Sequence, residues 1–291
     1  MPGFLYSYRK FRERYELPIV KNQDPEALTA LRRMTGPFVL RRLKKDVLRE
    51  LPTKEERIVY SAASGRQQKL YTASALKLKE ALAGGAWSGN GKLEVLSQLM
   101  RLRQICCDPA LCFEDYTGES AKLETCVSLI ASASAAGHKI LLFSQFASML
   151  ERIRERLLQE GISSHLLVGA TPKEERSRMV QAFASDEVPV FLISLKAGGT
   201  GLNLTAADIV IHYDPWWNVA AQNQATDRAY RIGQEKPVTV YKLILKDTIE
   251  ENLLKLQNAK LALAAQVVSE GMVSLGDLSQ NELMELFEQN P

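Results

Sequence analysis

The chain has 291 residues, of which 46% are hydrophobic and 24% are charged, proportions that are ordinary for a globular protein. No apolar run approaches the ~18 residues of a membrane-spanning helix, and the N-terminal residues lack the apolar segment of a signal peptide, so neither feature is predicted. The four cysteines and three histidines are not spaced as zinc ligands, so no metal site is predicted, and reduced thiols in a cytoplasmic protein fit better.

Residues 1–60 form a basic segment that we expect to be a helix-containing arm. They hold 14 Lys and Arg against 8 Asp and Glu, a net charge of +6, whereas the whole chain carries only +3. A basic segment on a near-neutral body can mark a nucleic-acid contact, and a solvated helical face explains the charge equally well. Because the chain begins within this stretch, we expect it to continue from a longer protein.

Residues 61–119 are expected to form a helical subdomain. One helix is predicted over 66–83 and a second over 92–106, where leucines recur at helical spacing. A glycine-rich loop joins the two helices, and Asp108-Pro109 stops the second.

From residue 120 onward, helices and strands alternate, which predicts a doubly wound parallel sheet. Strands are expected at 139–144, 165–168, 188–194, 209–213 and 238–245, and helices at 122–135, 147–159 and 171–183. Thr171-Pro-Lys-Glu174 is read as a capping box with Pro at the first helical position. Thr171 is better explained as the N-cap of this helix, although helix N-termini also bind phosphate. Beyond this region, amphipathic helices are expected over 250–268 and 275–286.

Two arginines, Arg228 and Arg231, are the leading candidates for chemistry. They lie in the run 224–234, Gln-Ala-Thr-Asp-Arg-Ala-Tyr-Arg-Ile-Gly-Gln, and the residues before them read as a helix. A spacing of three would place both guanidiniums on one helical face, with Gln224 one turn earlier. An arginine pair on a rigid element can neutralise the charge of a transferring phosphoryl group. A solvated basic helix face is the alternative interpretation.

A glycine-rich loop, Ala197-Gly-Gly-Thr-Gly201, follows the strand predicted at 188–194. Its glycines would let backbone N–H groups approach a phosphate closely. The loop fails the dinucleotide-binding pattern, because Leu204 stands where the third glycine is required. A tight turn without a ligand is the alternative.

Other polar and aromatic residues lie directly beyond predicted strand ends, where a parallel sheet collects its ligands. Ser144 and Gln145 follow one strand, Lys196 follows another, and Trp216 and Trp217 follow a third. The two tryptophans are candidates for base stacking, although a structural role near these loops is favoured.

The sequence contains no G-x-x-x-x-G-K-[ST] phosphate loop. The nearest candidate ends in Gly91-Lys-Leu93, but Ala86 replaces the first glycine and Leu93 stands where Ser or Thr would hold magnesium. No Asp-Glu-Ala-His-like box follows a hydrophobic strand either. A complete ATP-hydrolysing site is therefore not predicted from this chain alone.

Taken together, these motifs make the chain resemble the Swi/Snf-type DNA translocases, the chromatin-remodeller branch of the helicase superfamily. That family has two RecA-like lobes, and this chain resembles the second. The matching stretches are 38–47, 102–106, 139–146, 193–205, 209–218 and 224–234. The chain departs from the family pattern at Val219, where Pro is usual, and at Tyr230, where His often precedes the second arginine.

The resemblance implies an α/β fold, a RecA-like doubly wound parallel sheet flanked by helices, with an N-terminal helical arm and C-terminal helices. Four parts are expected: a basic arm linking to a first lobe (1–60), a helical insertion (61–119), the second RecA-like lobe (120–250) and a C-terminal helical extension (251–291).

The resemblance also implies roles for individual residues. Three would act on the γ-phosphate of ATP, the last two as arginine fingers: Gln224, Arg228 and Arg231. Three more would lie on the ATP side: Gly201, Asn203 and Asp227. Five would contact the backbone of double-stranded DNA: Ser144, Gln145, Lys196, Gly199 and Thr200. ATP and magnesium would be held mainly by the first lobe of the same polypeptide.

The function expected is therefore that of the second motor lobe of an ATP-dependent double-stranded DNA translocase, inactive in ATP hydrolysis by itself. A non-catalytic nucleic-acid or protein-docking module with the same fold is the alternative. The motif sequences Trp-Trp-Asn and Arg-Ile-Gly-Gln argue against an RNA-helicase lobe. A cytoplasmic or nucleoid-associated location is expected, or a nuclear one in a eukaryote, and the C-terminal helices are a possible site for a protein partner.

Overall fold

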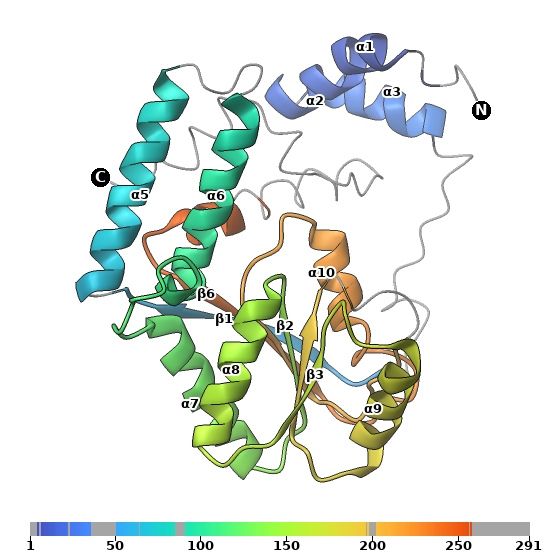
Figure 1. Ribbon diagram of the computed structural model, residues 1–291. Coiled ribbons are helices and arrows are strands. Elements are labelled where there is room, and N and C mark those ends of the chain that lie inside the picture. The colour runs from blue at the N-terminus through green and yellow to red at the C-terminus, as the bar shows by residue number, and fades with distance from the viewer. Residues whose placement is uncertain are drawn as a thin grey trace. The chain divides into compact units, whose positions relative to one another are not determined.

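The fold is described from a computed structural model of the chain (Figure 1). The structure describes residues 5–35 without 6 and 23, 51–84 without 64, 91–255 without 196 and 198–201, and residue 257. Contacts divide the chain into two compact units. One comprises Met1–Arg49 with Lys255–Met272, and the other comprises Glu50–Leu254 with Val273–Pro291.

The first unit contains the helices expected in the basic arm. Its elements are α1 (Tyr8–Phe11), the π-helical turn η1 (Arg12–Glu16), α2 (Leu17–Asn22) and α3 (Pro25–Thr35). Tyr15, Ile19 and Leu31 are buried together and give these helices a small apolar core. The Asp24 carboxylate accepts hydrogen bonds from the backbone N–H groups of Glu26 and Ala27, and so caps the start of α3.

The second unit is built on one sheet of six parallel strands in the order β1-β6-β5-β2-β4-β3 (Figure 1). The strands are β1 (Lys54–Ser61), β2 (Ile140–Ser144), β3 (Ser164–Leu167), β4 (Val190–Ser194), β5 (Ile209–His212) and β6 (Val238–Leu245). Every residue of β2, β4 and β5 is buried, which explains why these strands read as continuous apolar runs. The doubly wound parallel sheet predicted from the sequence is confirmed.

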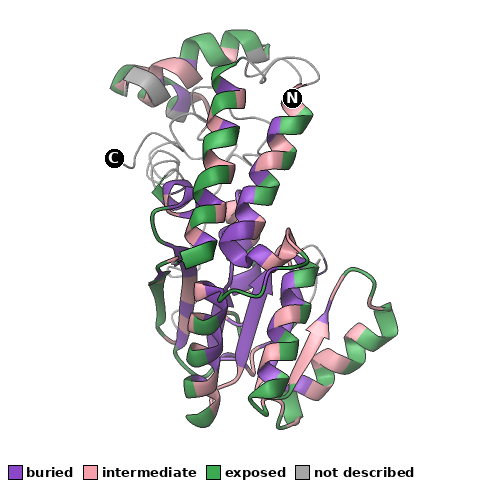
Figure 2. Cartoon of the chain, turned by 60° about the vertical axis from the view of Figure 1, so that its left-hand side comes forward, coloured by how far each residue is buried: buried purple, intermediate pink, exposed green. Residues whose placement is uncertain are grey.

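Helices cover both faces of the sheet, and the central strands consist of buried residues (Figure 2). On one face, α7 (Ala121–Ala135) and α8 (Ala147–Gln159) pack against Leu142 and Leu192. On the other, α9 (Lys173–Ser185) and α10 (Val219–Thr226) pack against Phe143 and Ile193, with Phe183 and Ala225 contributing from the helices.

Strand β1 is an element that the sequence analysis missed, because residues 51–60 were assigned to the arm. The structure pairs β1 with β6 in parallel, in a register from Lys54 opposite Val238 to Ser61 opposite Leu245. Most residues of this edge strand are exposed and four of the first five positions are charged, so neither a buried apolar run nor an alternating pattern marks it. The Glu56 carboxylate binds Lys54 and Lys242, each at 2.8 Å, which ties the strand to its neighbour.

The helical subdomain is a hairpin of α5 (Gly65–Ala83) and α6 (Gly91–Cys107), followed by a short 3-10 helix, η3 (Pro109–Leu111). Tyr71, Leu78 and Leu82 form part of the buried side of α5. The Gln67 side chain donates to the Ile105 carbonyl oxygen at 3.1 Å, which joins the bases of the two helices. Both predicted helices are confirmed to within one residue at each end.

The predicted capping box at 171–174 is wrong. Helix α9 begins at Lys173 with Pro172 as its N-cap, and no side chain caps it. The Thr171 hydroxyl instead accepts a hydrogen bond from the Val168 backbone N–H at 3.1 Å, so it closes the turn before the helix.

The helices predicted at 250–268 and 275–286 fall mostly outside the described residues. Residues 249–255 are helical, and Ile249 and Leu253 are buried. Among the helices of the described ranges, none combines the length and the apolar character that crossing a bilayer requires.

Candidate functional site

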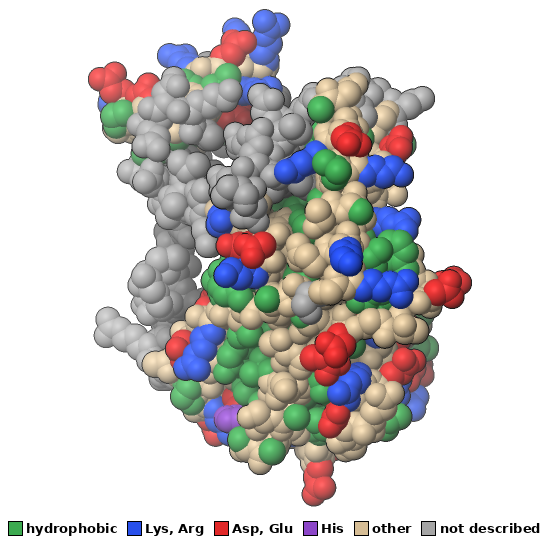
Figure 3. Space-filling model, turned by 90° about the vertical axis from the view of Figure 1, so that its left-hand side faces the viewer, with side chains coloured by type: hydrophobic (Ala, Val, Ile, Leu, Met, Phe, Trp, Pro, Cys, Tyr) green, Lys and Arg blue, Asp and Glu red, His purple; other side chains and the backbone are tan. Residues whose placement is uncertain are grey.

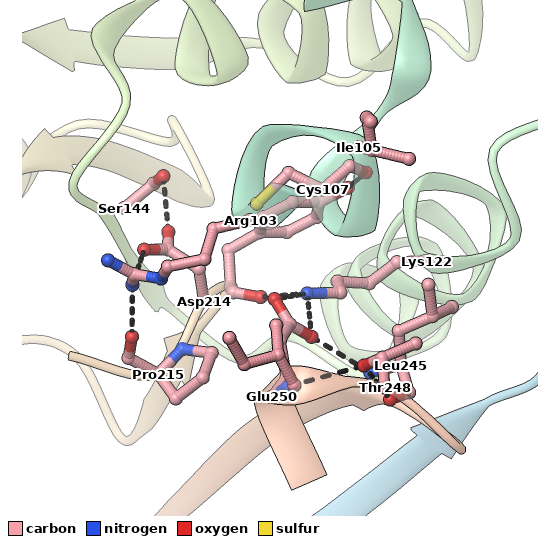
Figure 4. A network of polar contacts seen from close by, with 12 residues as sticks. Arg103, Ile105, Cys107, Lys122, Ser144, Asp214, Pro215, Leu245, Thr248 and Glu250 are labelled. Atoms are coloured by element: carbon pink, nitrogen blue, oxygen red, sulfur yellow. Dashed lines mark hydrogen bonds and ion pairs between the residues drawn. The ribbon is translucent and has the colours of Figure 1, made fainter. Parts of the chain in front are cut away.

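A buried polar network lies where β2 and β5 end, at the carboxyl edge of the sheet (Figure 4). The Asp214 carboxylate accepts hydrogen bonds from the Ser144 hydroxyl at 2.5 Å and from the Gln145 side-chain amide at 2.5 Å. It also accepts the Gln145 backbone N–H at 3.2 Å. The two loops that follow neighbouring strands are therefore joined through one carboxylate.

Arg103 reaches into this network from α6. Its guanidinium donates to the Gln145 side-chain oxygen at 2.9 Å and to the Pro215 carbonyl oxygen at 2.5 Å, and lies 3.6 Å from Asp214. The side chain is 1% exposed and its guanidinium lies over the Trp217 ring at 5.5 Å. A buried carboxylate needs a compensating charge, and Arg103 supplies it while anchoring the helical hairpin to both loops.

A second buried ion pair, Lys122 with Glu250, lies beside the first (Figure 4). Both side chains are fully buried, and the Lys122 ammonium lies 2.5 Å from the Glu250 carboxylate. The ammonium also donates to the Tyr213 carbonyl oxygen at 3.3 Å, and Glu250 accepts the Leu245 backbone N–H at 2.9 Å. Burial opposes the charged form of Lys122, but the adjacent Glu250 carboxylate raises the Lys122 pKa above its ordinary value.

The structure thus brings Ser144 and Gln145 together at the carboxyl edge, as predicted. The Ser144 side chain is fully buried, however, and both side chains are occupied with Asp214 and Arg103. Their contact with DNA stays a prediction. Trp217 is buried under Arg103, which agrees with the structural role favoured for it.

Four predicted site residues lie outside the described residues: Lys196, Gly199, Thr200 and Gly201. The beginning of their loop is held by Arg176, whose guanidinium donates to the Ala197 carbonyl oxygen at 3.2 Å. The same guanidinium donates to the carbonyl oxygens of Thr171 and Gly169 at 2.9 and 3.0 Å. Arg176 therefore fixes the loop after β3 against the loop after β4, a role that the sequence did not reveal.

The helix predicted to carry both arginines is shorter than expected. Helix α10 ends at Thr226, Asp227 is its C-cap, and Arg228 and Arg231 follow in a turn. The placement of both guanidiniums on one helical face is therefore wrong. Arg228 is buried, whereas Arg231 and Gln224 are exposed. Burial, and then the positive charge of Arg231, lower the pKa of Arg228.

The arginine turn is fixed to the segment that follows the glycine loop. The Gln234 side-chain amide donates to the carbonyl oxygens of Ala207 at 2.8 Å and of Thr205 and Ala229 at 3.1 Å. The Leu204 backbone N–H donates to the Arg228 carbonyl oxygen at 3.1 Å. Asn203, which precedes Leu204, is exposed. The two predicted ATP-side elements, the segment at Asn203 and the arginine turn, are therefore neighbours.

His212 anchors the end of α10 and gives a prediction about pH. Its imidazole Nε2 lies 2.9 Å from the Thr226 hydroxyl, and burial, helped by Lys242, lowers the pKa of His212 to about 3. The unfolded chain, with a histidine pKa near ~6.5, takes up this proton first. The contribution of neutral His212 to stability is therefore complete above that pH and is lost as the pH falls toward 3.

We expect this one group to reduce the free energy of unfolding by about 2 kcal/mol between pH 6.5 and pH 5. Urea denaturation at the two pH values, on the wild type and on His212→Gln, measures the difference. An equally steep loss of stability in both proteins would contradict the assignment to His212.

Comparison with known proteins places this geometry in a family. The family model described as "Helicase conserved C-terminal domain" matches residues 121–233, and the one described as "SNF2-related domain" matches residues 1–111. The structure also aligns with the whole of the SWI2/SNF2 ATPase C-terminal domain of Sulfolobus solfataricus. That alignment covers 82% of this chain at 31% identity and a TM-score of 0.66. The chain belongs to the SWI2/SNF2 family of ATPases.

Two further relatives align with almost the whole of this SWI2/SNF2 chain. The chain is 41% identical to the putative ATP-dependent helicase/translocase YwqA of Bacillus subtilis. That match covers 98% of this chain and 32% of YwqA. The chain is 34% identical, with a TM-score of 0.68, to the Sulfolobus solfataricus SWI2/SNF2 ATPase core in complex with dsDNA. That match covers 98% of this chain and 61% of the other. The chain thus spans about a third of its curated relatives, and its sheet is the C-terminal RecA-like lobe of the family.

Proposed function

We propose that this chain is the second motor lobe of an ATP-dependent double-stranded DNA translocase, which acts together with a first lobe. The observation that carries the proposal is the arginine turn, which contains Arg228 and Arg231. Hydrogen bonds of the Gln234 side chain and of the Arg228 carbonyl hold this turn beside the segment at Asn203. Two arginines held in one turn can together bind an anion, because each guanidinium presents a planar fork of hydrogen-bond donors.

The anion proposed is the γ-phosphate of ATP. Arg228 and Arg231 would approach it from this lobe and stabilise the charge that develops during phosphoryl transfer, with Gln224 beside them. The residues proposed to lie on the ATP side are Gly201, Asn203 and Asp227. Because the sequence contains no phosphate loop, the remaining phosphate contacts and the magnesium ligands are assigned to the first lobe.

DNA would lie along the carboxyl edge of the sheet, where strands β2 and β4 end and the loops after them begin. The proposed backbone contacts are Ser144, Gln145, Lys196, Gly199 and Thr200. The Ser144 hydroxyl is buried, so this residue would act indirectly. It donates to Asp214 and thereby helps to hold the Gln145 loop in place. Contacts of this kind grip phosphates without reading sequence, as a translocase requires. The relative solved with dsDNA supports this part of the proposal.

The isolated 291-residue chain is expected to have negligible ATPase activity, because it contains neither a phosphate loop nor a magnesium-binding acidic box. Phosphate release measured with and without duplex DNA tests this. The control is the same preparation of the Arg231→Ala variant, which should show the same background. DNA-stimulated turnover that disappears in that variant would show that the chain holds a complete site.

DNA binding by the chain is expected to be independent of sequence and steeply weakened by salt, because the proposed contacts are to phosphates. Titration of duplexes of unrelated sequence over a range of salt concentrations measures both properties. Lys196→Ala should weaken binding uniformly and reduce the slope of log K against log salt by about 0.9. A sequence-selective complex that salt barely affects would contradict the backbone-contact proposal.

A further inference from the structure

The hairpin of α5 and α6 carries a concentrated positive charge that the proposed site does not use. Residues 65–84 and 91–107 contain seven Lys and Arg against two Asp and Glu, a net charge of +5, which exceeds the +3 of the whole chain. Of the seven, only Arg103 belongs to the network at the carboxyl edge. The hairpin is therefore a second strongly basic part of the chain, in addition to the basic segment of residues 1–60.

Three of these cations form a row along one face of α5. Arg66, Lys69 and Lys77 fall within an arc of roughly 80° on the helix, and their Cα atoms span a rise of about 16 Å. All three are exposed. Their face lies opposite the buried face of the helix, to which Tyr71 and Leu78 belong. Glu80, one turn beyond Lys77, ends the row toward the hairpin tip.

The charge of this cation row (Arg66, Lys69 and Lys77) is not compensated within the part of the chain that the structure describes. No carboxylate there lies within ion-pair distance of any of the three. Other surface cations of the same unit do have partners, for example Arg156 with Glu124. Arg66 lies over the Tyr116 ring at 5.5 Å, which holds its guanidinium in place without neutralising it.

The row is also rigidly connected to the motor. The α5 base is joined to α6 through Gln67, and α6 inserts Arg103 between the loops after β2 and β5. The Tyr71 hydroxyl accepts the Ile249 backbone N–H at 2.7 Å, which fixes the same helix to the segment after β6. Figure 3 views the molecule from the side on which α5 lies in Figure 1 and shows Lys and Arg side chains spaced along that side.

We propose that the cation row of α5 binds the sugar-phosphate backbone of duplex DNA, as a contact separate from the loops at the carboxyl edge. A straight, rigid row of cations without ion-pair partners in the described ranges matches a partner whose charges repeat at short, regular intervals. Each strand of a duplex presents a phosphate about every 3.4 Å of its axis. The inference rests on the proposed function, because it assumes that the protein works on duplex DNA. The cation row would be a second DNA-binding surface, and Arg103 connects its helical hairpin to the loops after β2 and β5.

The test is DNA binding by the 291-residue chain with the row neutralised, in the triple variant Arg66→Gln, Lys69→Gln and Lys77→Gln. Gln keeps the helix propensity of these positions, and circular dichroism checks the fold. Loss of three phosphate contacts should lower the slope of log K against log salt by about 2.7 and weaken binding on the order of 10²-fold at 0.1 M salt. In the protein carrying both lobes, kcat at saturating DNA should stay unchanged while the DNA concentration for half-maximal ATPase rises.

The matched control removes three charges elsewhere in the same unit, with Arg154→Gln, Arg156→Gln and Lys236→Gln. The control variant should leave the slope of log K against log salt nearly unchanged, because phosphate contacts are lost only when the cation row is neutralised. Equal slopes in the two triple variants would overturn the proposal while leaving DNA binding itself, and so the proposed function, intact. Absence of DNA binding by the wild type would instead contradict the proposed function. If the row variant lost poly-glutamate binding as strongly as duplex binding, the surface would be one for acidic protein segments and the proposal would fail.

Discussion

Replacing Arg228 or Arg231 with Ala is expected to lower ATP turnover by on the order of 10³-fold in the protein that carries both lobes. The two guanidiniums would stabilise charge that forms only in the transition state, so their loss should act on kcat far more than on ATP binding. DNA affinity in the absence of nucleotide should stay nearly unchanged. Steady-state ATPase at saturating DNA, with nucleotide and DNA binding measured on the same variants, tests all three expectations.

The substitutions with Lys sharpen the test. A lysine keeps the charge but lacks the planar fork of donors, so Arg231→Lys should restore little of the turnover. Arg178→Ala, on the exposed surface of α9, is the control for loss of a surface arginine and should leave kcat within about twofold. Near-wild-type turnover of both alanine variants would mean that the arginine turn takes no part in ATP hydrolysis. Loss of DNA binding with hydrolysis intact would place the pair on the DNA side.

Breaking the buried pair of Lys122 and Glu250 is expected to produce the largest loss of stability. Lys122→Met removes the ammonium and leaves a fully buried carboxylate without its counter-charge, which costs about 3–5 kcal/mol. The Leu245 N–H that donates to Glu250 cannot offset this. Urea unfolding of the single variant measures the change in the free energy of unfolding.

The double variant Lys122→Met, Glu250→Leu provides the control. With both charges replaced by apolar side chains of similar size, no charge is left unpaired in the interior, so most of the lost stability should return. A double variant as unstable as Lys122→Met would show that packing, and not the uncompensated charge, sets the cost. A single variant as stable as the wild type would mean that the pair is not buried in solution.

The sheet was predictable because its central strands carry their own signal. Strands β2, β4 and β5 are buried on both faces and read as apolar runs bounded by polar residues, so their positions follow from local sequence. Strand β1 lacked that signal, since an exposed edge strand rich in charges resembles a basic arm. The order of strands, which places β1 beside β6, depends on contacts between residues far apart in the chain.

The site was only partly predictable, for a related reason. The motif residues could be identified from their positions after strands, but the end of α10 could not. Thr226 at that end binds His212, and the Arg228 carbonyl accepts the Leu204 N–H, so tertiary contacts replace the next helical turn. Arg103 was missed because its partners, Gln145 and Pro215, lie 42 and 112 residues away. A basic residue within an apolar helical stripe was the available signal.

The arginine assignment is tested most directly by a structure of the protein carrying both lobes, bound to duplex DNA and a transition-state analogue of ATP. We expect the guanidiniums of Arg228 and Arg231 both to donate hydrogen bonds of about 2.7–2.9 Å to the group that mimics the transferring phosphoryl. We also expect DNA phosphates to lie against the loops that follow β2 and β4. Finding both guanidiniums on the DNA backbone or in solvent, with the phosphoryl mimic held by the first lobe alone, would contradict the arginine assignment.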